Sequence, residues 1–132
     1  SDHLPSPPGS PAAMRWLDWL PFGRVPEIAP AELAARLGTA DAPVVIDVRS
    51  SAEVALGVVP GARHLPVQEL AARLDELGLP AGAEVVAVCK TAHRSIPAVR
   101  LLRERGFDAR QLAGGMDAWR RAGLPVAQPG RG

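Results

Sequence analysis

Two short runs of β-branched residues, each followed by a helix-like segment, constrain the fold of this chain most. The run Val44–Ile46 ends at Asp47, and the run 84–88 leads directly into Cys89. Short, uninterrupted apolar runs are typical of strands that are buried on both faces of a sheet. Strands that alternate with helices at this spacing form a parallel sheet with helices on both sides. The pattern therefore predicts an α/β fold.

The remaining elements follow from hydrophobic periodicity and from the residues at element ends. Apolar residues recur at helical spacing in 67–77, which closes on Gly78, and Gly106 closes another helix. Ser51 and Ser95 stand where an N-cap is expected. We expect helices over residues 31–37, 51–56, 67–77, 95–105 and 116–122, and further strands over 62–65 and 109–112.

The 132 residues suit one domain of ordinary size. Residues 1–13 are rich in proline and poor in large apolar side chains, so we expect a disordered arm or a vector-derived tail there. The N-terminal aromatic segment, 14–25, carries Trp16–Phe22, which we interpret as a short helix on the domain edge; the alternative is an arm that docks on a membrane surface or a partner. The domain itself is expected over 26–127 and a C-terminal tail over 128–132.

Charge and cysteine content exclude several function classes. Lys and Arg number 15 against 14 Asp and Glu, so the basic excess of a nucleic-acid binder is absent. No stretch is apolar enough to cross a membrane, and the start does not resemble a signal peptide; we therefore expect a cytoplasmic protein without stable membrane association. Cys89 is the single cysteine, which excludes an intramolecular disulfide and a cysteine-rich metal site. No metal or other cofactor is expected.

The loop after the second valine-rich strand carries the candidate chemistry. In an open α/β sheet, ligands bind beyond the carboxyl ends of the strands, where loops lead into helix N-termini. There the helix dipole, free backbone N–H groups, Lys90 and Arg94 would stabilise a thiolate on Cys89. The same N–H groups could cradle an anion, with two further donors from Arg94. A lone cysteine at a strand end is most often a small buried hydrophobe, but this cationic loop favours catalysis.

Three stretches resemble the rhodanese, or sulfurtransferase, domain family in their order and spacing. VVIDVRSSAEVALGVVPGARHLP contains an Asp-x-Arg pair, then a Glu and a Gly-x-x-Pro-Gly-Ala segment. VVAVCKTAHRSIPAVRLLRERGF is similar to the family's active-site strand, loop and helix, and LAGGMDAWRRAGLPV to its C-terminal signature. The resemblance implies a three-layer fold, in which helices flank a central five-stranded, mostly parallel sheet.

By this resemblance, Cys89 is the catalytic nucleophile. Its thiolate would attack the outer sulfur of a small anionic donor such as thiosulfate, expel sulfite and hold the sulfur as a persulfide. A thiol, a protein acceptor, or cyanide in an assay would then take the sulfur. The expected substrate-binding residues are those of the loop: Lys90, Thr91, Ala92, His93, Arg94 and Ser95. The alternative from another class is a non-catalytic persulfide carrier or interaction module.

Loop length separates this chemistry from a third hypothesis, a small phosphatase or arsenate reductase. Four residues lie between Cys89 and Arg94, as in rhodaneses that act on sulfur, whereas the related phosphatases and arsenate reductases use C-x5-R. His93 could shuttle a proton or attract an anionic donor, or it could be a solvent-facing loop residue.

Ala92 departs from the family pattern, which has Gly at this position. If the backbone there requires a positive φ, a β-carbon costs about 1 kcal/mol or more of strain and could distort or slow the cradle. The resemblance also assigns supporting roles outside the loop. We expect Asp47 to anchor loop N–H groups and Arg49 to pair with Glu53; the alternative is a direct catalytic role for Asp47 and Arg49.

Overall fold

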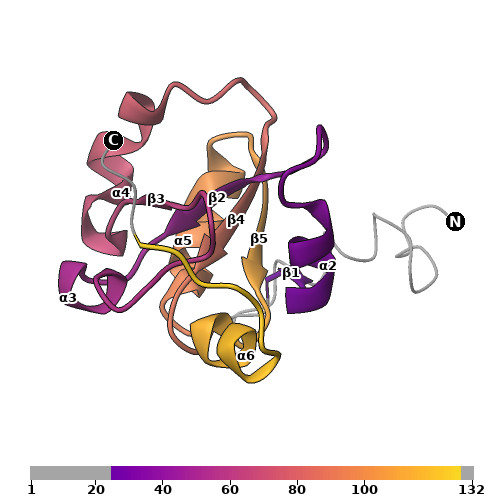
Figure 1. Ribbon diagram of the computed structural model, residues 1–132. Helices are drawn as coiled ribbons and strands as arrows, with labels where there is room; N and C mark the ends of the chain where they lie inside the picture. The colour runs from indigo at the N-terminus through magenta and orange to yellow at the C-terminus, as the bar shows by residue number, and fades with distance from the viewer. Residues whose placement is uncertain (1–24, 129–132) are drawn as a thin grey trace, which may run out of the picture.

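The computed structural model describes residues 25–128, which form three layers, a sheet between two layers of helices (Figure 1). The strands are β1 (Glu27–Ile28), β2 (Val44–Asp47), β3 (Arg63–His64), β4 (Glu84–Val88) and β5 (Asp108–Leu112). The helices are α2 (Pro30–Arg36), α3 (Ser51–Val54), α4 (Val67–Arg73), α5 (Ser95–Glu104) and α6 (Gly115–Arg121), with a 3₁₀ helix, η1 (Leu74–Leu77). The predicted α/β class is confirmed.

The five strands form one sheet in the order β1-β5-β4-β2-β3. All four strand pairings are parallel, so the sheet is more uniform than the mostly parallel one expected. The valine-rich β4 lies at its centre, between β5 and β2. Strand β1 was not predicted from the residues, because two residues show no periodicity. It lies at the sheet edge, where Glu27 pairs with Gln111 and Ile28 with Leu112.

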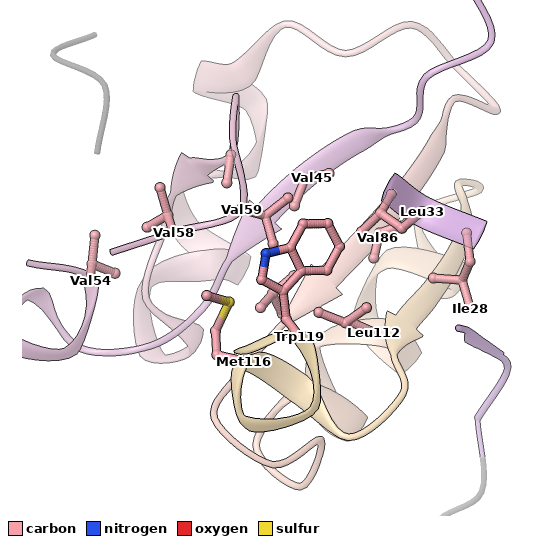
Figure 2. Packing of buried hydrophobic residues seen from close by; sticks show 12 residues of the cluster. Ile28, Leu33, Val45, Val54, Val58, Val59, Val86, Leu112, Met116 and Trp119 are labelled. Carbon is pink, nitrogen blue, oxygen red and sulfur yellow. The ribbon is translucent and has the colours of Figure 1, made fainter. Parts of the chain in front are cut away.

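Each face of the sheet has its own hydrophobic core. Successive strand residues point to opposite faces, so β4 gives Val86 and Val88 to one cluster and Val85 and Ala87 to the other. Helices α2 and α6 cover the first face, where Trp119 lies at the centre of the apolar side chains (Figure 2). Helices α4 and α5 cover the second. The central strand is thereby fixed from both sides, and so is the point where it ends.

Helices α4 and α3 differ in detail from the prediction. The segment 67–77 is α-helical only to Arg73 and continues as the 3₁₀ helix η1, which ends at Gly78 with a φ of +62°. The N-cap of α3 is Ser50 and not Ser51, because Ser50 and Glu53 form a reciprocal capping box. The Ser50 Oγ accepts the Glu53 N–H at 3.3 Å, and the Glu53 carboxylate accepts the Ser50 N–H at 3.1 Å.

The expected arm over 1–13, most of the aromatic segment over 14–25 and most of the tail over 128–132 lie outside the described residues. Between residues 25 and 128, no helix is both long and apolar enough to span a membrane.

Candidate active site

Cys89 directly follows the carboxyl end of the central strand, β4, where the loop to α5 begins. It is only 1% exposed. The start of α6 holds the base of this loop: the Met116 N–H donates to the Cys89 carbonyl at 2.8 Å, and the Asp117 N–H to the Lys90 carbonyl at 3.0 Å. Two elements outside the loop, β4 and α6, thus hold the backbone that carries the thiol.

The loop turns back around the sulfur. The Ala92 N–H donates to the Cys89 Sγ at 3.0 Å, and the Ser95 Oγ lies 3.4 Å from the same sulfur. A backbone N–H aimed at a sulfur stabilises negative charge there without having to reorganise. The geometry therefore suits a sulfur nucleophile that carries charge during its reaction.

Ala92 has a φ of +78° and is the single non-glycine residue with a positive φ between residues 25 and 128. This meets the condition under which the sequence predicted strain. The same turn aims the Ala92 N–H at the sulfur, so the strained backbone is part of the cradle.

Replacing Ala92 by Gly is expected to stabilise the protein. The change relieves the left-handed strain, and the greater freedom of glycine in the unfolded chain offsets part of the gain, leaving roughly 0.5 kcal/mol. Urea unfolding measures the difference. Ala81→Gly, in an exposed turn without a positive φ, is the matched control and should lower stability instead. A loss of stability in Ala92→Gly as large as in the control would contradict the strain argument.

Arg94 is held by Glu53 of α3. Its two terminal nitrogens donate to the two carboxylate oxygens at 2.7 and 2.6 Å. These hydrogen bonds from Arg94, reinforced by those from Ser50, lower the pKa of Glu53 from its ordinary 4.5 to about 2. Glu53 therefore pairs with Arg94 of the loop. The prediction that it pairs with Arg49 is wrong. The pairing fixes the guanidinium at the rim of the site and leaves each terminal nitrogen one further N–H for an anion.

The stabilising contribution of Glu53 is expected to disappear in acid. Because its pKa is lower in the folded chain, the contribution is complete above about pH 5 and is lost as the pH falls towards 2. At neutral pH, Glu53→Gln should lose about 1 kcal/mol of unfolding free energy, a value that allows for solvent screening of the pair. Urea unfolding at several pH values should show the wild type and the variant converging. A gap that stays constant down to pH 3 would contradict the pairing, and Glu76→Gln, at an exposed ion pair with Arg73, serves as control.

Asp47 and Arg49 form a buried ion pair at the end of β2. The Arg49 Nη2 donates to the Asp47 Oδ2 at 2.8 Å and to the Gly57 carbonyl at 2.7 Å. The Asp47 Oδ1 also accepts the Arg49 backbone N–H at 3.0 Å, so Asp47 holds one backbone N–H of the segment that follows β2. Arg49 therefore pairs with Asp47 and not with Glu53. The pair shapes the neighbouring turn, and the hydrogen bonds that hold it do not reach the sulfur.

The other loop side chains, those of Lys90, Thr91 and His93, lie at the surface. The Lys90 side chain is 61% exposed, with its Nζ 3.7 Å from the Asp117 carboxylate. His93 is exposed, and its Nδ1 lies 3.0 Å from the Thr91 Oγ1. The structure thus brings the six predicted loop residues together, with Lys90 and Arg94 as cations at the rim.

Ser95 does not cap α5, although the sequence predicted that it would. Arg94 occupies the N-cap position, and Ser95 is the first helical residue. Its buried hydroxyl donates to the Gln111 Oε1 on β5 at 2.6 Å. Gln111 was missed, although a polar residue on the same strand face as the buried Ala109 was a usable signal.

Comparison with known proteins adds an independent line of evidence. A model of the Rhodanese-like domain matches residues 29–122. A sulfurtransferase from Allochromatium vinosum is 35% identical over 106 residues, which make up 80% of this chain and 97% of the relative. A rhodanese-related protein from Thermoplasma volcanium has a TM-score of 0.70 at 26% identity, over 78% of this chain and 98% of that one. A thiosulfate sulfurtransferase from Pseudomonas aeruginosa has a TM-score of 0.70 at 31% identity, over 80% of this chain but 20% of that one.

Proposed function

This chain belongs to the rhodanese-like domain family, and from that premise we propose that it transfers a sulfane sulfur through a persulfide on Cys89. The donor is a small sulfur-containing anion such as thiosulfate. The acceptor is a thiol, free or on a protein, and cyanide can replace it in an assay. One observation carries the proposal: the Ala92 N–H is aimed at the Cys89 Sγ from 3.0 Å, at the carboxyl end of the central strand.

In the first step, the Cys89 thiolate attacks the outer sulfur of thiosulfate. A new S–S bond forms, the S–S bond of thiosulfate breaks, and sulfite leaves with its electron pair. The persulfide that remains carries charge next to the Ala92 N–H, which is already in position to stabilise it. Lys90 and Arg94 at the rim attract the anionic donor.

In the second step, the acceptor attacks the outer sulfur of the persulfide, and the electron pair of the broken S–S bond returns to Cys89. Because Cys89 is the single cysteine of the chain, the persulfide has no internal thiol to react with. The sulfur must leave to an external acceptor. The C-x4-R loop supports sulfur over phosphate or arsenate as the transferred group.

Steady-state kinetics with thiosulfate and cyanide test this function. A reaction through a covalent sulfur intermediate gives parallel lines in double-reciprocal plots, because sulfite leaves before cyanide binds. We expect thiocyanate formation with this pattern. Lines that intersect would contradict the two-step mechanism. Absence of thiocyanate, with persulfide still formed, would favour the carrier alternative, and clear hydrolysis of an aryl phosphate would favour a phosphatase.

A further inference from the structure

A chain of hydrogen bonds leads from the nucleophile to the edge of the sheet. The Ser95 Oγ lies 3.4 Å from the Cys89 Sγ and 2.6 Å from the Gln111 Oε1. The Gln111 Nε2 donates to the Glu27 Oε2 at 2.8 Å. Ser95 is 0% exposed and Gln111 4%, while Glu27 lies at the surface, opposite Gln111 in the β1–β5 register. A surface carboxylate is thereby connected to the reactive sulfur through two buried side chains.

The Glu27 carboxylate at one end of these hydrogen bonds determines which group donates in each of them. An ionised carboxylate only accepts hydrogen bonds, so the amide nitrogen of Gln111 must face Glu27. The amide oxygen of Gln111 then faces Ser95, and the single hydroxyl proton of Ser95 is donated to it. Ser95 therefore presents a lone pair to the Cys89 sulfur.

This arrangement treats the two forms of the sulfur differently. A protonated thiol can donate its proton to the Ser95 Oγ, whereas an ionised sulfur faces a lone pair and keeps the Ala92 N–H as its donor. To donate to an ionised sulfur, the Ser95 hydroxyl must turn away from Gln111, and the Gln111 oxygen loses that hydrogen bond. Gln111 and the sulfur thus compete for one proton.

We propose that Gln111, oriented by Glu27, is a positioning residue that directs the Ser95 hydroxyl and so sets the pH at which Cys89 becomes a reactive thiolate. The effect of this positioning on turnover rests on the sulfur transfer proposed above. The role itself concerns the protonation of one thiol, and it can be measured without any sulfur donor.

Other charged or titratable groups lie on the elements that pack around the loop. They remain unchanged in the comparisons below, so that differences between variants report the hydrogen-bond chain. These groups are Lys90, His93 and Arg94 in the loop, Asp117 on α6, Glu53 on α3, and Asp47, Arg49 and His64 at the ends of β2 and β3.

The composition of the chain makes the measurement direct. The protein has one cysteine and no tyrosine, so the ultraviolet absorbance of a thiolate can be titrated without tyrosinate interference, and Cys89→Ser supplies the blank. Gln111→Met removes the acceptor at similar length and frees the Ser95 hydroxyl for the sulfur. We expect the midpoint of the Cys89 titration to fall by roughly half a pH unit. Ser95→Ala removes the lone pair that faces the sulfur and supplies no donor in its place, so it should lower the midpoint by less than Gln111→Met does.

The double variant Ser95→Ala/Gln111→Met is the decisive comparison. If Gln111 acts through Ser95, its substitution has no effect once the hydroxyl is gone, whereas a general loosening of the site would shift both backgrounds alike. The exposed Glu27→Gln covers the case in which Gln111→Met does not fold: it should lower the midpoint only when Ser95 is present. An unchanged or higher midpoint in Gln111→Met overturns the proposal, as does the same result in Glu27→Gln where Gln111→Met does not fold. An equal shift in the Ser95→Ala background also overturns it. If the midpoints shift as expected but the wild-type protein forms no thiocyanate, the proposed function is overturned instead.

Discussion

Cys89→Ser is expected to reduce thiosulfate-to-cyanide turnover by at least about 1000-fold, because a hydroxyl cannot carry the sulfane sulfur between donor and acceptor. The measurement is thiocyanate formation at saturating thiosulfate, with wild type and variant at equal concentration. Serine has nearly the size of cysteine, and the thiol is buried between β4, the loop and α5. The loss should therefore not come from a changed fold.

Urea unfolding controls for that fold. We expect the unfolding free energy of Cys89→Ser to lie within about 1 kcal/mol of the wild type, since one small buried atom is exchanged for another. Comparable turnover in a folded Cys89→Ser would show that another group carries the sulfur, and the assignment of Cys89 would be wrong.

The second large effect is expected at Gly115, the first residue of α6. A Cβ there would lie 2.5 Å from the carbonyl carbon and oxygen of Lys90 and closer still to the carbonyl oxygen of Cys89, and the φ of +62° adds strain. Gly115→Ala should cost roughly 3 kcal/mol of unfolding free energy, which urea unfolding measures. Because the clash pushes against the base of the catalytic loop, turnover of the folded fraction should fall by about 100-fold.

Gly123→Ala separates the clash from backbone strain. Gly123 follows the other end of α6, with a φ of +73°, and a Cβ added there would meet no neighbouring atom within 4 Å. Its substitution should cost about 1 kcal/mol and leave turnover unchanged. Equal losses at the two glycines would contradict the close approach of α6 to the loop.

The sequence predicted those parts of the molecule that depend on local pattern. β4 is a continuous valine-rich run, and its end places Cys89 and the loop before α5 without any knowledge of distant contacts. The positive φ at Ala92 was also foreseeable, from a departure at a position where the family has glycine.

The remainder depends on contacts between residues far apart in the chain. Glu53 could pair with Arg49 by proximity in sequence, but folding brings it to Arg94, and Arg49 finds Asp47 instead. A serine at a helix start is a good N-cap by local rules, yet burial against β5 turns Ser95 towards Gln111. Tertiary hydrogen bonds outweigh local preference at both places.

Sulfur transfer through Cys89 can be tested by the intact mass of the protein after incubation with thiosulfate, before and after addition of cyanide. We expect the wild type to gain one sulfur atom, located on Cys89, and to lose it again when cyanide is added. The Cys89→Ser variant, treated in parallel, should gain nothing. A wild-type protein that gains no sulfur, or a variant that gains as much as the wild type, would contradict sulfur transfer through Cys89.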